Sequence, residues 1–210
     1  MAKYTYNDKY FEIIDSDDKA YWLGFLYADG CIYEINNKSK SKHAIKPMML
    51  ELSLQEKDKY HLEKFARDIK TDARIFKKET KINDKVYYSY KINIYNTKIC
   101  RDLIKLGCTQ RKSLTLTFPK SGLLNGYESA FIRGYFDGDG CIHYSERNYV
   151  DKHNNKSYTQ KNLCVSIVGT NEFLSSLKNI VHPYDICFNF VKRANVGNAF
   201  EIKMCKKTSY

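Results

Sequence analysis

Alternation of apolar and polar residues predicts strands in both halves of the chain. In the segment 48–54, "MMLELSL", three leucines alternate with Glu51 and Ser53. This period of two is typical of a strand that buries one face. The segments 86–95 ("VYYSYKINIY") and 162–168 ("NLCVSIV") show further strand patterns. In 86–95, one face carries Val86, Tyr88, Tyr90, Ile92 and Ile94, and the other carries Tyr87, Ser89, Lys91, Asn93 and Tyr95.

Helices are predicted around these strands in the same order in both halves. The segments 18–29 and 126–139 each begin a series, and a second helix starts near Asp58 in one and near Asn171 in the other. Both residue types favour a helix N-cap. Helical spacing then gives apolar stripes, which are Leu62, Phe65, Ala66 and Ile69 in the first series and Phe173, Leu177, Ile180 and Val181 in the second.

The two series end differently. The first closes with a short helix over 97–106, for which Gly107 is a suitable C-cap. The second stops before an equivalent helix, since the final residue, Tyr210, aligns with Cys100. Between its strands, the second series carries "YVDKHNNKSYTQKN" (149–162), which we interpret as a long polar hairpin loop.

The common order reflects an internal duplication. "KAYWLGFLYADGCI" (19–32) aligns without a gap with "SAFIRGYFDGDGCI" (129–142). A repeat of this length indicates two copies of one structural unit. We expect a first repeat over 1–107, a linker over 108–125 and a second repeat over 126–210 that lacks its last helix. The identical pairs are Ala20/Ala130, Gly24/Gly134, Asp29/Asp139, Gly30/Gly140, Cys31/Cys141 and Ile32/Ile142.

Small residues at matching positions predict that the two repeated helices pack against each other. Gly24 and Ala28 are four residues apart, as are Gly134 and Gly138. A glycine inside a helix destabilises it by about 0.5–1 kcal/mol relative to alanine. Close approach of two helix backbones offsets this loss, so the spacing favours a helix pair between the repeats.

The two aspartates that end these helices indicate a cation site. A helix C-terminus carries partial negative charge, so Asp29 and Asp139 are unfavourable there unless a positive ion compensates. Mg²⁺ or Mn²⁺ suits carboxylate and carbonyl oxygens, and the backbone of Ala28 and Gly138 is a further candidate donor. An Asp-Gly pair alone is also a common turn. We interpret Asp137, which matches a tyrosine in the first copy, as a turn or helix-end residue.

Charge and composition narrow the class of partner. Thirty-five Lys and Arg against 24 Asp and Glu give a net charge of +11, which favours a polyanion such as nucleic acid. Seven cysteines without a C-x-x-C pair favour reduced thiols over a disulfide framework or a zinc site. No apolar run is long enough to span a membrane. We expect an intracellular protein, cytoplasmic or organellar, with no membrane partner.

With these features in place, the chain resembles the LAGLIDADG homing endonucleases in their two-motif, single-chain form. "WLGFLYADG" (22–30) and "IRGYFDGDG" (132–140) both keep the third-position glycine, the eighth-position aspartate and the final glycine of the signature. The resemblance implies an α+β fold of tandem pseudo-symmetric αββαββα repeats, with two antiparallel sheets forming a DNA-binding saddle. It also implies a monomer that hydrolyses double-stranded DNA at a long asymmetric target, using Mg²⁺ or Mn²⁺.

The resemblance implies roles for several residues. Asp29 and Asp139 would hold metal and act in catalysis, and a basic residue after the last helix of a repeat would lie near the scissile phosphate. Lys112 matches that position, with Arg111 as its rival. Ser53 and Ser166 would occupy similar places on the second strands and help to organise water. The expected DNA-contacting residues are Ser89, Lys91, Asn93, Tyr95, Arg111 and Lys203.

Two other functions stay open from the sequence. One is an intron-encoded maturase that binds RNA, and the other is a DNA-binding protein that no longer cleaves. Retention of both aspartates argues against the second, whereas the missing final helix argues for it. His143 and His153 lack partners at ligand spacing, so we treat both as non-catalytic.

Overall fold

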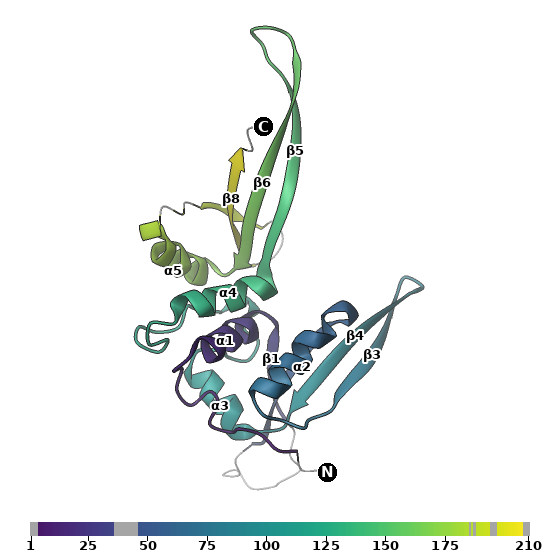
Figure 1. Ribbon diagram of the computed structural model, residues 1–210, viewed down its shortest axis with the longest axis vertical. Coiled ribbons are helices and arrows are strands. Elements are labelled where there is room, and N and C mark those ends of the chain that lie inside the picture. The colour runs from purple at the N-terminus through teal and green to yellow at the C-terminus, as the bar shows by residue number, and fades with distance from the viewer. Residues whose placement is uncertain (1–3, 36–45, 185, 187, 194–196, 208–210) are drawn as a thin grey trace. The chain divides into compact units, whose positions relative to one another are not determined.

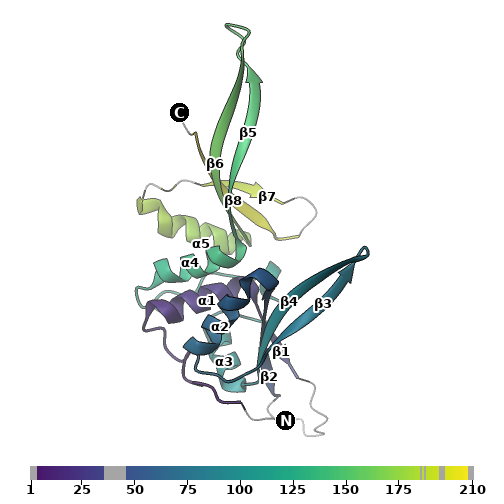
Figure 2. The same ribbon diagram turned by 45° about the vertical axis from the view of Figure 1, so that its right-hand side comes forward.

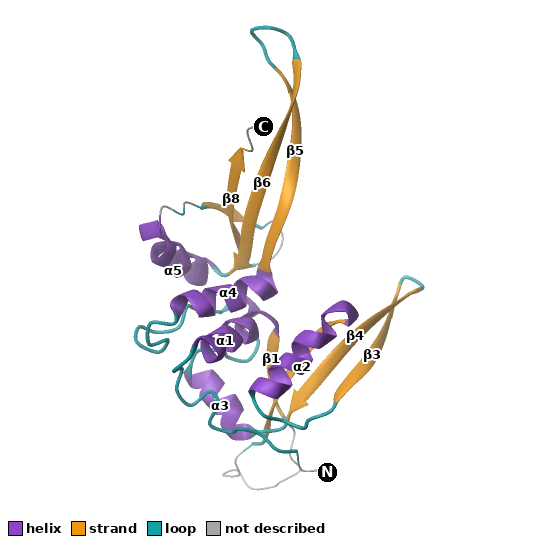
Figure 3. Cartoon of the chain, in the orientation of Figure 1, coloured by secondary structure: helices purple, strands orange, loops and turns teal. Residues whose placement is uncertain are grey.

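The computed structural model describes residues 4–35, 46–184, 186, 188–193 and 197–207 (Figure 1). Two compact units divide the chain. The first contains residues 1–112 and 119–138, and the second contains residues 113–118 and 139–210. Each unit holds one four-stranded antiparallel sheet (Figure 3), so the predicted α+β class with two antiparallel sheets is confirmed.

The first unit contains the helices of the first repeat and the motif helix of the second. Its sheet has the strand order β1-β2-β4-β3. Helices α2 and α3 pack against β2, and α4 runs alongside α1 (Figure 2). The elements are α1 (Asp17–Asp29), β1 (Gly30–Glu34), β2 (Met48–Gln55), α2 (Lys59–Asp68), β3 (Ile75–Ile82), β4 (Lys85–Ile94), α3 (Thr97–Lys105) and α4 (Glu128–Asp139), with 3-10 turns over Glu56–Asp58 and Lys112–Leu114.

The second unit repeats the sheet with different strand lengths. Its order is β5-β6-β8-β7, and α5 packs against β6 and β8. The elements are β5 (Gly140–Val150), β6 (Ser157–Gly169), α5 (Asn171–Val181), a 3-10 turn over His182–Tyr184, β7 (Asn189–Lys192) and β8 (Phe200–Lys207). Leu52 pairs with Gly30 and Ile92 in the first sheet, and Ile167 pairs with Gly140 and Ile202 in the second, so Ile92 and Ile202 hold equivalent positions.

The first unit buries its core around α1. Every residue of α1 from Ala20 to Tyr27 is buried, and Trp22 and Leu23 are completely enclosed. Leu50 and Leu52 of β2 are also completely buried, whereas Ser53 is exposed. The predicted alternation therefore holds, and the opposite face of this sheet stays accessible.

The predicted loop over 149–162 is wrong, and part of the segment 86–95 is exposed. The segment 149–162 is not a long loop, because strand pairing continues up to Val150 and resumes at Ser157. Stacking of Tyr149 on Tyr158, with ring centroids 5.8 Å apart, supports this extension. In the β3–β4 hairpin, Val86 and Tyr88 are exposed, since the hairpin extends beyond the helices that cover its inner half (Figure 1).

Helix caps and one cysteine also differ from expectation. Thr170, rather than Asn171, caps α5, and its side chain accepts a hydrogen bond from the Phe173 amide. Asp58 holds the N-cap position of α2 but makes no side-chain cap bond. Cys31, Cys100, Cys108 and Cys141 are free thiols, but Cys164 is disulfide-bonded, so the prediction of reduced thiols is wrong there.

Among the described residues, no helix combines the length and the apolar character needed to cross a membrane.

Candidate active site and nucleic-acid interface

Helices α1 and α4 meet along a seam of residues that have almost no side chain. A Cβ atom added to Gly24 would lie 2.0 Å from the Phe131 carbonyl oxygen. A Cβ atom added to Gly134 would lie 1.9 Å from the Tyr21 carbonyl oxygen. No side chain fits at these separations, so the seam requires glycine on both helices. The predicted helix pair is confirmed.

The seam continues to the C-terminal ends of both helices. A Cβ atom added to Gly138 would lie 2.3 Å from the Ala28 Cβ and 3.2 Å from Asp29 Oδ2. The residues that precede the two predicted catalytic aspartates are therefore in contact. Asp29 and Asp139 are the last residues of α1 and α4, and both side chains are exposed.

Lys112 begins the 3-10 turn Lys112–Leu114, and its side chain reaches Gly30, the first residue of β1, which follows Asp29 in the sequence. Its ammonium group donates to the Gly30 carbonyl oxygen, and the side chain is only 8% exposed. Its rival, Arg111, is exposed and has a backbone φ of 52°. Of the two basic residues proposed for this place, Lys112 is the one whose charge is directed to the C-terminal end of α1.

A second polar group near Asp29 was not predicted from the sequence. The Tyr21 hydroxyl donates to Asp137 Oδ2 at 2.7 Å and lies 3.1 Å from His61 Nε2. Arg133 covers the Tyr21 ring, with its guanidinium carbon 5.1 Å from the ring centroid. Asp137 lies in the last turn of α4, as expected of a helix-end residue, and it also bonds across the helix pair.

Burial shifts the pKa values within this group. The pKa of Tyr21 is raised, first by burial and then by its hydrogen bond to Asp137. The pKa of His61 is lowered, first by burial and then by Lys64, although the carboxylates of Asp137, Asp58 and Asp68 oppose the shift. A lowered histidine pKa keeps this imidazole neutral at pH 7.

A cavity of about 580 Å³ connects these residues to Asp29. It lies between the C-terminal halves of α1 and α4, the end of β2 and the start of α2. The residues that line the cavity combine aromatic side chains with hydrogen-bonding groups. The lining residues include Tyr21, Asp29, Ser53, Gln55, His61 and Asp137.

The donor set at the helix ends suits a hard divalent cation shared with a substrate. Asp29 supplies carboxylate oxygens, and backbone carbonyls at the helix ends can add more. In the described part of the chain, no group of three or more His, Cys, Asp or Glu could form a complete protein cage. Mg²⁺ commonly keeps waters and binds substrate phosphate in such places. The residues present therefore fit the expected metal.

The open face of the first sheet, which we define as the face opposite α2 and α3, carries the predicted DNA-contacting row. Lys91 and Asn93 of β4 lie there, opposite Ser53 and Glu51 of β2. Lys91 and Asn93 are half-buried, and Tyr95 beyond the strand end is 48% exposed. Ser89 pairs with Gln55 on the same face. All four residues of the predicted row therefore share one accessible surface.

The register of the second sheet corrects one predicted equivalence. Cys31 pairs with Glu51, whereas Cys141 pairs with Ser166. Ser166 is therefore the counterpart of Glu51, and the counterpart of Ser53 is Val168. Ser166 is also 96% buried, being only 4% exposed. Lys203 pairs with Ser166.

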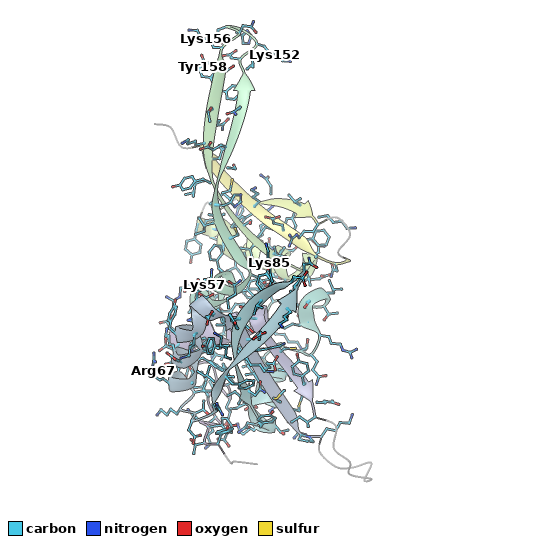
Figure 4. All side chains as sticks on the ribbon, turned by 90° about the vertical axis from the view of Figure 1, so that its right-hand side faces the viewer. Lys57, Arg67, Lys85, Lys152, Lys156 and Tyr158 are labelled. Carbon is cyan, nitrogen blue, oxygen red and sulfur yellow. The ribbon has the colours of Figure 1, made fainter. Side chains whose placement is uncertain are left out.

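The β5–β6 hairpin gives the second unit a basic, aromatic extension. Lys152, Lys156 and Tyr158 lie at its outer end (Figure 4), and all three are exposed. Asn154 donates to the Tyr158 hydroxyl at 2.9 Å, which orders the turn. Lysine and tyrosine side chains in this arrangement suit contacts to nucleic-acid phosphates.

Sequence reasoning missed Tyr21, His61 and Glu51. Tyr21 lies on the apolar helix α1 and has the pattern of a core residue, whereas His61 of the amphipathic helix α2 and Glu51 of β2 have the pattern of ordinary polar positions. The only available clue was the sixth motif position, where Asp137 replaces a tyrosine. The sequence does not identify Tyr21 as the partner of Asp137, because the two residues are far apart in the chain.

Comparisons with known proteins agree with this architecture. Residues 22–106 match the family model described as LAGLIDADG endonuclease, and residues 126–180 match that described as LAGLIDADG-like domain. Together these matches cover about two thirds of the chain. No curated protein sequence matches the chain.

Solved structures with a similar fold include meganucleases and a LAGLIDADG homing endonuclease. A structure of meganuclease I-SmaMI bound to uncleaveable DNA has a TM-score of 0.58 at 12% identity, over 88% of this chain and 78% of that one. The homing endonuclease I-LtrWI bound to target DNA has a TM-score of 0.58 at 13% identity, over 95% and 79%. Meganuclease I-AabMI bound to uncleaved DNA has a TM-score of 0.54 at 13% identity, over 87% and 77%.

The paired motif helices, the two antiparallel sheets and the two family matches lead to one assignment: this chain belongs to the LAGLIDADG endonuclease family, in the form that carries two motifs in a single chain.

Proposed function

We propose that this protein is a sequence-specific endonuclease of double-stranded DNA that hydrolyses phosphodiester bonds with a divalent metal, Mg²⁺ or Mn²⁺. The observation that carries the proposal is the contact between Ala28 and Gly138, which brings together the helix ends that bear the two motif aspartates. Both family models match the segments on either side of this contact.

Each residue at the site has a defined task in this proposal. Asp29 and Asp139 hold the metal through their carboxylates, with the carbonyls of Ala28 and Gly138 as further donors. A metal in this place would activate water and neutralise charge on the phosphate. Lys112 supplies a fixed positive charge near Asp29, and its bond to the Gly30 carbonyl keeps its side chain from rotating away.

DNA recognition is assigned to the strands. The net charge of +11 favours a duplex, and Ser89, Lys91, Asn93 and Tyr95 lie on one accessible face. Arg111 and Lys203 would add contacts. The related structures named above are DNA complexes, which favours duplex DNA over intron RNA. One chain contains both motifs, so we propose that the active form is a monomer.

Divalent metal dependence has indirect support. One I-SmaMI structure is of the protein bound to an uncleaved DNA target in the presence of calcium ions. For this chain, we expect Ca²⁺ to allow binding and Mg²⁺ or Mn²⁺ to allow cleavage.

A cleavage selection tests the proposal directly. The full chain is incubated with a library of random duplex DNA and Mg²⁺, and the cut ends are sequenced. We expect one long, asymmetric target to be cut in both strands. Asp29→Asn and Asp139→Asn should each reduce cleavage by about 100-fold or more, since each removes a metal ligand, while duplex binding in Ca²⁺ is retained.

The control is Asp8→Asn, which makes the same charge change at an exposed residue away from the helix ends. It should leave cleavage unchanged. Cleavage that persists in purified Asp29→Asn would overturn the role of this carboxylate. Selective retention of duplex DNA without cuts would indicate a protein that only binds, and retention of structured RNA alone would indicate a maturase.

A further inference from the structure

An acidic residue lies in the middle of the open face of the first sheet. Glu51 forms an ion pair with Lys91, in which Lys91 Nζ lies 2.8 Å from Glu51 Oε2. Asn93, with its amide nitrogen turned to the carboxylate, lies 3.3 Å from the same oxygen. The Lys91 ammonium also lies 5.1 Å from the centroid of the Phe76 ring. These contacts hold Glu51 and Lys91 as one unit.

Stability does not account well for this unit. The side chains of Lys91 and Glu51 are 20% and 21% exposed. An ion pair that keeps access to solvent contributes little to the free energy of unfolding. A carboxylate on a surface that faces DNA also repels phosphate. Its presence there suggests a task that phosphate contacts do not fulfil.

That task can be the recognition of base edges. In the major groove, lysine donates to guanine O6 and N7, and glutamate accepts from the N4 amino group of cytosine. Both groups belong to one G·C pair and lie side by side on its edge. The Lys91 donor and the Glu51 acceptor are likewise adjacent.

We infer that Glu51 and Lys91 together read a single G·C base pair of the DNA target, with Asn93 as the positioning residue of the carboxylate. This inference rests on the proposed function. An A·T pair is less favoured, because lysine pairs preferentially with guanine and glutamate with cytosine, and the A·T edge adds an apolar thymine methyl group. The inference therefore names the preferred base pair at one target position.

Binding selection with a variant of Glu51 tests the inference. Random duplex DNA is retained by the full-length protein in Ca²⁺, without cleavage, and then sequenced. We expect the wild-type target to contain one position fixed as G·C that Glu51→Gln relaxes, with a loss of discrimination of about tenfold or more. Glutamine favours adenine, so A·T should rise at that position while the other positions keep their preferences.

The control is Glu56→Gln, which makes the same charge change in a different ion pair, between the turn after β2 and strand β3. Glu56 lies 2.7 Å from Lys77. Lys77 pairs with Tyr90 and so lies on the opposite face of the sheet from Lys91. Glu56→Gln should leave every position of the target unchanged. Lys91→Met should relax the same position as Glu51→Gln.

The failure of the inference can be distinguished from the failure of the proposed function. An unchanged target preference in Glu51→Gln would overturn the inference and leave the endonuclease in place. Relaxation at a position that is A·T in the wild type would overturn the G·C assignment. If the wild type enriches no duplex sequence at all, both the proposed function and the inference fall.

Discussion

Helices α1 and α4 carry the two copies of one motif, yet equivalent positions make opposite kinds of contact. In one direction, Tyr27 of α1 packs edge-on against Phe131 of α4, with ring centroids 5.0 Å apart. In the other direction, Asp137 of α4 accepts a hydrogen bond from Tyr21 of α1. Tyr27 aligns with Asp137 and Tyr21 aligns with Phe131 in the duplication. The same pair of positions is therefore apolar on one side of the seam and polar on the other.

The difference shows that close contact of the two helices requires glycine at equivalent positions but allows different side chains at the neighbouring positions. Gly24 and Gly134 bring the backbones into contact, and this demand is equal on both helices. The positions beyond them need only complement each other. The apolar side is enclosed in the core, where the Tyr27 hydroxyl donates to the Leu106 carbonyl oxygen at 2.5 Å. The polar side borders the cavity that contains Asp29.

Breaking the shared seam should have the largest effect. In Gly24→Ala, the new methyl group meets the Phe131 backbone, which no rotamer change can move away. We expect the free energy of unfolding to fall by about 3 kcal/mol, at the upper end for overpacked cores. Urea unfolding followed by Trp22 fluorescence measures this loss, since Trp22 is the only tryptophan and is completely buried in the first unit.

Because Gly24 and Gly134 hold equivalent positions on the two helices, the same substitution can be tested on both. Gly134→Ala should destabilise to a similar extent, and Gly24→Ala/Gly134→Ala should lose less than the sum, because either methyl group alone already separates the helices. Gly122→Ala is the control, with open space around the new Cβ and only a φ of 82° to oppose it. Equal losses in Gly122→Ala and Gly24→Ala would contradict the steric explanation.

The seam itself could be predicted because its cause is local in sequence. Small residues four positions apart on two aligned helices indicate that the two helix backbones pack closely. The alternation at Leu50 and Leu52 likewise indicates which face of the strand is buried. Lys112 could be matched to its place only through the family resemblance. The position of its ammonium group at the Gly30 carbonyl depends on how the chain returns after α3.

The polar side of the seam could not be predicted, because its contacts are not local in sequence. A hydrogen bond such as that between Tyr21 and Asp137 needs two side chains to meet across elements, and no local pattern identifies Tyr21 as the partner of Asp137. The Glu51–Lys91 ion pair depends on strand register, which a single sequence determines poorly. The error over Ser166 has this cause, since a shift of two residues keeps the face but changes the partner.

The apolar side should give the next largest effect. Gly107 has a φ of 99°, and a Cβ atom there would lie 2.2 Å from the Tyr27 hydroxyl oxygen. We expect Gly107→Ala to lower the free energy of unfolding by about 2 kcal/mol through left-handed strain and displacement of this hydroxyl. Tyr27→Phe alone should lose about 1 kcal/mol, because the Leu106 carbonyl loses its partner.

Combining the two changes sharpens the test. Tyr27→Phe removes the atom that the alanine methyl group would strike, so Gly107→Ala should destabilise Tyr27→Phe less than it destabilises the wild type. Urea unfolding followed by Trp22 fluorescence gives both differences. Strict additivity would mean that Gly107 and Tyr27 act independently, and that only the backbone conformation requires glycine.

The polar side should contribute less, because it is partly open to water. Tyr21→Phe and Asp137→Ala each remove one partner of the 2.7 Å hydrogen bond, and each should lower the free energy of unfolding by about 1 kcal/mol. The double variant should resemble the single variants, since the bond can be lost only once. If the two losses add, the contact is not an energetic pair, and the contrast with Tyr27 and Phe131 is only geometric.

The smallest effect should appear in the pH dependence of the polar side, through His61. Burial and Lys64 lower the pKa of this imidazole when the protein is folded, against the opposing carboxylates of Asp137, Asp58 and Asp68. The unfolded chain therefore binds the proton more tightly, at its ordinary pKa of about 6.5. The stability that neutral His61 contributes is present above this pKa and is lost as the pH falls through the lower, folded value.

A comparison with His61→Gln isolates this contribution. Glutamine keeps a hydrogen-bonding group near the Tyr21 hydroxyl but does not titrate in this range. The urea midpoint of the wild type should decrease from pH 7.5 to pH 5 by more than that of His61→Gln. Parallel profiles would mean that His61 has the same pKa folded and unfolded. The polar side of the seam would then be fixed by Tyr21 and Asp137 alone, without coupling to protons between pH 7.5 and pH 5.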